Sequence, residues 1–158
     1  MVTEEEFRDA RKAVEELDAE TAKLKNAGEP VPPSLMSRRT RFTRIIDRYE
    51  TQKREPWFVT DIHAVRIGDF AFVSNRFELF IDFMHRIQGR SPFVQTIVVQ
   101  LTADPGQKGG GSYLATERAV FNRGYSATLQ SNQVSPAGGQ QLVDHTVDLL
   151  KRLHNAAK

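Results

Sequence analysis

The sequence contains no cysteine, one tryptophan and no long apolar run among its 158 residues. The absence of cysteine excludes disulfides, thiolate zinc sites, iron–sulfur clusters and cysteine nucleophiles, so any metal must be held by histidine, carboxylate or tyrosine. No segment approaches the roughly 18 apolar residues of a membrane span. The opening residues MVTEEEFRDARK are acidic, whereas a signal peptide would be basic and then apolar. We therefore expect a soluble globular chain.

Neither positive nor negative charge predominates. Charged residues make up 27% of the chain, yet the net charge is only +2. With 39% apolar residues, this composition is far from the low hydrophobicity and high net charge of disordered chains. Domains commonly contain about 100–200 residues, so the length indicates one structural unit with room for a helical extension.

Two amphipathic helices are predicted in residues 1–55. Apolar residues recur at spacings of three and four over residues 3–26, where Thr3 and Glu6 form a capping box. A second helix is predicted over residues 34–53. The first helix is acidic and the second is rich in arginine, so an antiparallel hairpin would pair opposite charges and explain this pattern without any ligand.

The remaining residues, 56–158, are predicted to form an α/β or α+β layer, a small mixed sheet covered by helices. Aromatic and β-branched residues mark the strands, and the unbroken apolar run near residue 97 is typical of a central strand buried on both faces. The predicted strands are 58–67, 70–73 and 95–101, with an extended segment over 125–130, and the predicted helices are 77–88, a short helix from Thr116 and 139–155.

Few residues carry a chemical signal that can be recognised from spacing alone. The sequence has no GxSxG, P-loop or GxGxxG motif, and none of its four histidines has a spacing that brings two rings to one metal. Glu78, Asp82 and His85 would share one face of the predicted helix 77–88, although a solvated surface is the commoner meaning of such a face. Three glycines, Gly109 to Gly111, could cradle an anion, or form a flexible loop tip.

The arginine-rich second helix raises the question of nucleic-acid binding. Its arginines surround the apolar stripe and do not form a separate face with interleaved aromatic residues. We therefore expect no nucleic-acid partner.

Several segments of the α/β layer form a pattern when they are taken together. They read VRIGDFAFVS, RFELFIDFMHRIQ, QTIVVQLT, a glycine-containing loop ending in SYLAT, ERAVFNRGYSA and QQLVDHTVDLLKRL. With these segments, the stretch Val65–Leu153 resembles the C-terminal portion of the catalytic domain in the neutral/alkaline non-lysosomal ceramidase family and its bacterial ceramidase-like relatives. Members of that family hydrolyse the amide bond of ceramide with one zinc ion, held by two histidines, a glutamate and a tyrosine.

The resemblance implies roles for three residues. It places the family's zinc-binding glutamate on Glu78, its zinc-binding tyrosine on Tyr113, and a tyrosine that contacts the substrate amide on Tyr125. Zinc would polarise the amide carbonyl and activate a water molecule, while the Tyr125 phenol would donate a hydrogen bond to the developing oxyanion. The implied substrate is an N-acyl, lipid-like amide.

The sequence departs from the family pattern at several places. Arg76 and Phe77 replace the Pro-Gly that precedes the glutamate in the family, and Gly110 replaces a second tyrosine. Nothing in residues 1–64 resembles the N-terminal half of the catalytic domain, which carries both zinc histidines. We therefore expect a C-terminal fragment of a larger catalytic domain, inactive alone, whose partner is the missing N-terminal half.

A different class of function is also open. The chain could be a non-catalytic interaction module on a degenerate scaffold, forming a homodimer through its N-terminal helices as a coiled coil.

Overall fold

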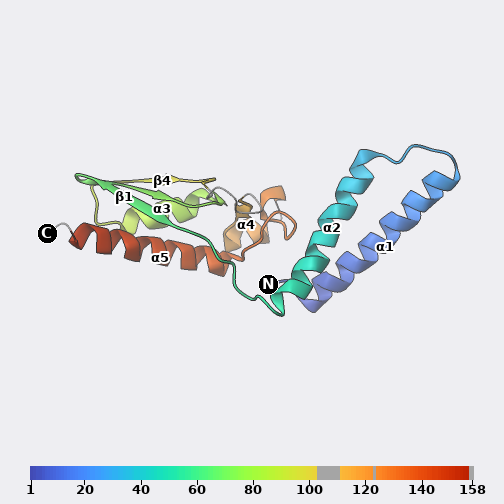
Figure 1. Ribbon diagram of the computed structural model, residues 1–158, viewed down its shortest axis with the longest axis horizontal. Coiled ribbons are helices and arrows are strands. Elements are labelled where there is room, and N and C mark those ends of the chain that lie inside the picture. The colour runs from blue at the N-terminus through green and yellow to red at the C-terminus, as the bar shows by residue number, and fades with distance from the viewer. Residues whose placement is uncertain (103–110, 123, 157–158) are drawn as a thin grey trace. The chain divides into compact units, whose positions relative to one another are not determined.

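The computed structural model describes residues 1–102, 111–122 and 124–156. It divides the chain into two compact units, Met1–Phe58 and Val59–Lys158, which we call the hairpin unit and the α/β unit. The hairpin unit is a pair of helices, and the α/β unit contains a three-stranded and a two-stranded sheet packed with helices (Figure 1). The expected mixed α/β class with an N-terminal helix pair is therefore confirmed.

The hairpin unit consists of α1, Glu4–Asn26, and α2, Pro33–Gln52. Helix α1 begins with the predicted capping box, in which the Thr3 hydroxyl accepts a hydrogen bond from the backbone N–H of Glu6 and the Glu6 carboxylate accepts one from the backbone N–H of Thr3. Gly28 follows the helix with a φ of +72°, which costs glycine little. Both predicted helices are confirmed to within one residue at each end.

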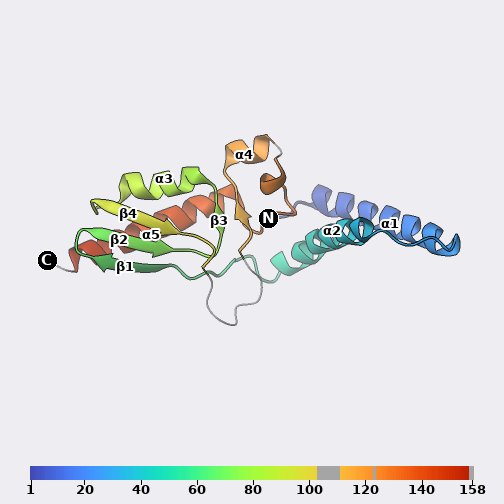
Figure 2. The same cartoon turned by 90° about the horizontal axis from the view of Figure 1, so that it is seen from above.

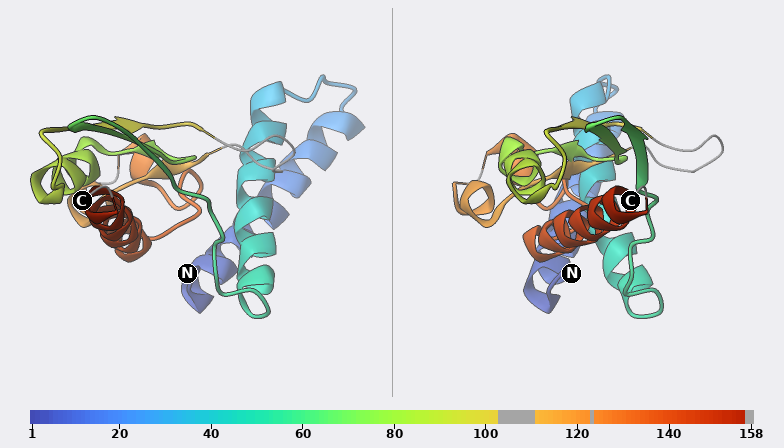
Figure 3. Two further views of the ribbon diagram at one scale, coloured as in Figure 1. Left: turned by 60° about the vertical axis from the view of Figure 1, so that its left-hand side comes forward. Right: turned by 90° about the vertical axis from the view of Figure 1, so that its left-hand side faces the viewer.

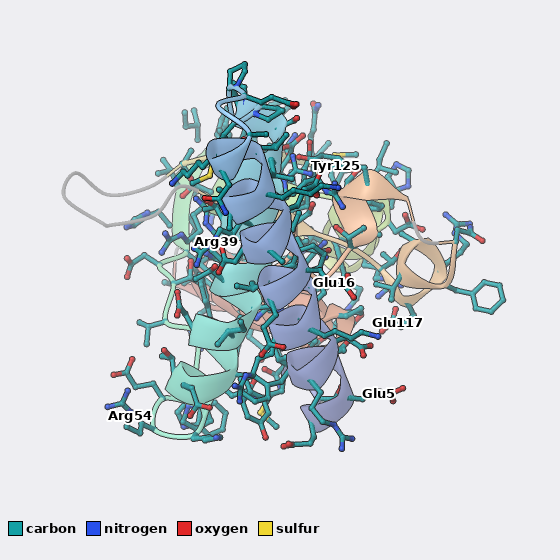
Figure 4. The ribbon with its side chains drawn as sticks, turned by 90° about the vertical axis from the view of Figure 1, so that its right-hand side faces the viewer. Glu5, Glu16, Arg39, Arg54, Glu117 and Tyr125 are labelled. Carbon is teal, nitrogen blue, oxygen red and sulfur yellow. The ribbon has the colours of Figure 1, made fainter. Side chains whose placement is uncertain are left out.

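Polar contacts join the two segments of the hairpin unit, among them those of Arg39, which is labelled in Figure 4. Arg39 donates from Nε to Asp18 Oδ1 at 2.5 Å and from Nη2 to Asp18 Oδ2 at 3.0 Å. At the open end of the hairpin, the backbone N–H of Val2 donates to Gln52 Oε1 at 2.7 Å, and Gln52 Nε2 donates to the Val2 carbonyl at 2.6 Å. The start of the first segment thus pairs with the end of the second, Val2 with Gln52, and Asp18 pairs with Arg39 nearer the turn. This is the pairing expected of an antiparallel hairpin between an acidic and a basic helix.

The apolar stripe of α1 packs against α2. Ala10 and Leu17 on α1 are buried, as are Leu35 and Ile45 on α2. Packing within the hairpin therefore accounts for the stripe on which the expectation of a coiled-coil dimer depends.

The larger sheet of the α/β unit has the strand order β1-β2-β4 (Figure 2). Strand β1, His63–Ile67, pairs antiparallel with β2, Phe70–Ser74, and β2 pairs parallel with β4, Gln95–Val99. The predicted hairpin is confirmed, but residues 58–62 are not a strand, because β2 ends opposite His63 and leaves them no partner.

The predicted central position of the strand near residue 97 is wrong, because β4 is an edge strand and β2 lies at the centre. Its apolar run suggested burial on both faces, yet Ile97 and Val99 are 36% and 40% exposed. Only the opposite face of β4, with Thr96 and the partly buried Val98, turns toward the core. The run is apolar on both faces although only one face is covered within this unit.

Two helices cover that inner face, α3, Ile81–Arg90, and α5, Pro136–Asn155 (Figures 1 and 3). They approach closely at Gly139, where an added Cβ would lie 2.4 Å from Cζ of Phe83. The residues of the core cluster come from both helices, the sheet and the segments beside it; they are Ala71, Val73, Phe77, Phe83, Ile87, Phe93, Leu114, Leu142, Val143, Val147 and Leu150.

A second, two-stranded sheet lies beyond the carboxyl end of β2. It pairs β3, Glu78–Leu79, with β5, Tyr113–Leu114, in parallel. The predicted helix 77–88 therefore begins only at Ile81, because strand pairing holds Glu78 and Leu79 in an extended conformation.

The chain then forms two short helical segments. Helix α4 spans Glu117–Phe121, as expected from Thr116 onward, and the 3₁₀ helix η1 spans Tyr125–Ala127. The prediction of an extended segment over 125–130 is wrong, since Ala127 and Thr128 donate backbone hydrogen bonds to Gly124 and Tyr125. Among the described residues, no helix has the length and apolar character needed to cross a membrane.

Candidate functional site

The turn after β2 positions Glu78. The backbone N–H of Asn75 donates to the Val99 carbonyl at 3.0 Å, and the Asn75 side-chain oxygen accepts from the N–H of Phe77 at 2.9 Å. Such side-chain caps are typical of asparagine in turns. Phe77 is buried in the core. Its packing therefore fixes the backbone position of the next residue, Glu78.

A close backbone approach brings β5 to β3. A Cβ added at Gly111 would lie only 1.5 Å from the carbonyl oxygen of Arg76, so any residue other than glycine would clash there. The N–H of Glu78 then donates to the Ser112 carbonyl at 3.0 Å, and the strand register places Glu78 opposite Tyr113.

Strand geometry decides which side chains share a face. Because successive side chains alternate between faces, the opposed residues Glu78 and Tyr113 lie on one side and Leu79 and Leu114 on the other. Leu114 is fully buried and Leu79 packs against the core. Glu78 and Tyr113 are both half-buried on the side that faces away from the core.

The two side chains interact directly. The pKa of the Tyr113 phenol is raised above its usual value of 10.0, first because the negative charge of Glu78 disfavours a phenolate, then because of partial burial and the nearby Tyr125, and last because the phenol is hydrogen-bonded to Glu78. The charge of Glu78 on one strand thus acts on the phenol of the residue opposite it on the other strand.

Tyr125 lies at the start of η1 and is the third residue of the group. Its ring lies 6.2 Å from the ring of Tyr113, between centroids, at an interplanar angle of 81°, which is an edge-to-face contact. Tyr125 is 64% exposed. The structure therefore brings together all three residues that the family resemblance singles out: Glu78, Tyr113 and Tyr125.

A buried asparagine holds η1 beside β5. Asn132 Oδ1 accepts from the N–H of Ala115 at 3.0 Å, while Asn132 Nδ2 donates to the carbonyls of Ser126 and Thr128 at 2.7 and 3.0 Å. These bonds connect the strand that carries Tyr113 to the turn that carries Tyr125. Sequence reasoning missed Asn132, and no local pattern marks it, because its partners come from two different segments.

The other candidate residues do not form a site. Glu78 belongs to β3, so the prediction that it shares a helical face with Asp82 and His85 is wrong. Asp82 is instead paired with Arg118, whose Nη2 lies 3.0 Å from Asp82 Oδ1.

Among the described residues, no group of three or more histidine, aspartate or glutamate side chains is placed to hold a metal ion. His63 lies beside Ser74, and His154 packs edge-on against Phe93. Of the three glycines, Gly111 serves the strand contact, while Gly109 and Gly110 lie outside the described residues.

No family model matches the sequence, and neither a curated protein nor a solved structure matches it significantly. The resemblance to the ceramidase family therefore stays a prediction that depends on the residues themselves.

Proposed function

We propose that the α/β unit supplies part of the zinc site of a ceramidase-like amidohydrolase, with Glu78 and Tyr113 as metal ligands and Tyr125 beside the substrate. One observation supports this proposal above all. Three side chains from separate segments lie together, with Glu78 opposite Tyr113 in the strand pair and the Tyr125 ring 6.2 Å from the ring of Tyr113.

The donor set fits part of a zinc site. Carboxylate and phenolate oxygens both bind zinc, and a cation held between the opposed side chains of Glu78 and Tyr113 would contact an oxygen of each. Zinc commonly takes four ligands, and the described residues bring no histidine to this group. The two remaining ligands would be histidines from a separate partner segment, the counterpart of the family's N-terminal half.

The chain's own residues would then act on an N-acyl, lipid-like amide. A bound zinc ion supplies Lewis acidity and a water of lowered pKa. The Tyr125 hydroxyl would donate a hydrogen bond to the oxygen of the scissile carbonyl as negative charge develops there, a contact whose loss costs about 100-fold to 1,000-fold in rate in comparable sites. Glu78 would bind the metal from a backbone position that pairing with β5 fixes.

The size of the native gene product is the first test. An immunoblot of source cells, with an antibody raised against this chain, should show a band several times larger than 17.9 kDa, because the histidine-bearing segment belongs to the same catalytic domain. A native band at 17.9 kDa, with no co-purifying partner, would contradict the proposal.

Zinc titration of the isolated chain gives an independent test. Two of four ligands should supply about half of the 10–16 kcal/mol typical of complete zinc sites, which corresponds to a dissociation constant on the order of 1–200 µM. Calorimetry should show this binding lost in Glu78→Gln and in Tyr113→Phe and retained in Asp82→Asn, whose carboxylate is paired with Arg118. Equal zinc binding by all variants would contradict the assigned ligands.

A further inference from the structure

The outer face of the larger sheet is apolar and lies on the side away from α3 and α5 (Figure 1). The strand register aligns its side chains in three rows across the sheet. The middle row is Val65, Phe72 and Ile97. The flanking rows are His63, Ser74 and Val99 on one side and Ile67, Phe70 and Gln95 on the other. We call these nine residues the outer face.

The outer face lacks the polar pattern of a solvated sheet. Antiparallel sheets with one free face normally carry polar residues on that face, whereas six of these nine outer residues are apolar. No aspartate, glutamate, lysine or arginine is among the nine residues. Five of the side chains, Val65, Ile67, Phe70, Ile97 and Val99, are nevertheless 36–62% exposed in this structure.

The arrangement of these residues has the anatomy of a protein interface. The apolar row lies in the middle, and the polar residues His63, Ser74 and Gln95 lie at its margins. The exposed apolar area is on the order of 500 Å², at the upper end of the largest patch on a typical monomer. Two such patches in contact would bury about 1,000 Å² before any rim is counted, which reaches the lower limit of a specific interface.

We propose that the outer face is a homodimer interface, in which the sheets of two copies of this chain pack face to face. Because the face carries no formal charge, a second copy meets it without like-charge repulsion, whereas a strongly charged partner would find nothing to pair with. A two-fold axis near the middle row brings each apolar row onto its counterpart, at the roughly 10 Å separation of packed sheets. This interface is distinct from the coiled-coil dimer expected of the N-terminal helices.

Sedimentation equilibrium of the full chain tests the proposal. The wild type should approach twice 17.9 kDa at micromolar concentration, and Ile97→Lys should raise the dimer dissociation constant at least about tenfold by placing a charge in the middle row. Val120→Lys is the matched control, because Val120 on α4 is 42% exposed and Ile97 is 36% exposed. Circular dichroism should show that both variants remain folded.

Crosslinking locates the interface directly. Because the chain has no cysteine, Val65→Cys introduces a single thiol in the middle row, and a bis-maleimide of about 10 Å should join two copies across the packed sheets. Val120→Cys should not be joined.

Three results would overturn the proposal. The wild-type chain could be monomeric at all concentrations, its dimer could be insensitive to Ile97→Lys, or the dimer could be lost in Met36→Lys on α2. So would a monomer that binds neutral phosphatidylcholine vesicles through this face.

Discussion

At the scale of single residues, the phenol of Tyr113 reports on the geometry of the candidate site. The charge of Glu78 is the largest cause of its raised pKa, so Glu78→Gln should lower that pKa toward 10.0. Tyrosinate absorbance over an alkaline titration, with Tyr113→Phe subtracted to isolate this residue, measures the shift. Asp82→Asn is the control, because that carboxylate is paired with Arg118. A Tyr113 pKa that is equal in the wild type and Glu78→Gln would show that the two side chains do not interact.

Gly111 is a second residue whose role can be measured. In Gly111→Ala the new Cβ would overlap the carbonyl oxygen of Arg76, so β3 and β5 must separate and the free energy of unfolding should fall by about 3 kcal/mol. Gly89→Ala is the matched control, because nothing lies within 4 Å of its added Cβ and alanine favours the helix by up to about 1 kcal/mol. Urea denaturation compares the two variants, and equal stability would contradict the close approach.

At the scale of elements, the pairing of α1 with α2 should depend on pH through Asp18. Its two hydrogen bonds with Arg39 lower the pKa of the Asp18 carboxyl below 3.8 in the folded state. A depressed carboxyl pKa adds stability above the unfolded value, and this contribution is lost as the pH falls through the folded value. The stability difference between wild type and Asp18→Asn should therefore be present at neutral pH and shrink below pH 3.8.

The control for this experiment is Asp9→Asn, which removes another carboxylate from α1. Thermal unfolding of the two variants between neutral and acidic pH separates the Asp18–Arg39 pair from the general effect of removing an acid. A stability difference for Asp18→Asn that does not change with pH would show that the ion pair is not formed in solution.

The elements also show what a single sequence can predict. The long helices follow from local signals, since the capping box at Thr3 and the apolar period fix α1 almost to the residue. Strand β3 could not be found in the same way, because the segment ELFIDFMHRIQ has a helical period and Glu78 is extended only by pairing with Ser112 and Tyr113. Pairing partners so distant in sequence leave no local trace.

The candidate site likewise has a part that the sequence could predict and a part that it could not. The types and positions of Glu78, Tyr113 and Tyr125 came from a family pattern, whereas their proximity depends on features that no pattern described. The close approach at Gly111 and the hydrogen bonds of Asn132 are long-range contacts. The family resemblance proposes the three residues, and tertiary pairing decides that they meet.

At the scale of the whole molecule, the two units differ in how much apolar surface they bury. Among the described residues, 18 apolar side chains are buried, five of them in the hairpin unit and 13 in the α/β unit. Each buried Val, Leu, Ile or Phe contributes about 1.5–3 kcal/mol, so the hairpin has the smaller margin against its conformational entropy. The five in the hairpin unit are Val2, Ala10, Leu17, Leu35 and Ile45.

We therefore expect the hairpin unit to open first. Hydrogen exchange followed by mass spectrometry in rising urea should release the amides of α1 and α2 before those of α5. Leu17→Ala should lower the protection of the hairpin by about 2–4 kcal/mol and leave α5 unchanged, because Leu17 is buried between α1 and α2. Loss of protection in α5 together with the hairpin, in the wild type or in this variant, would mean that the two units fold as one.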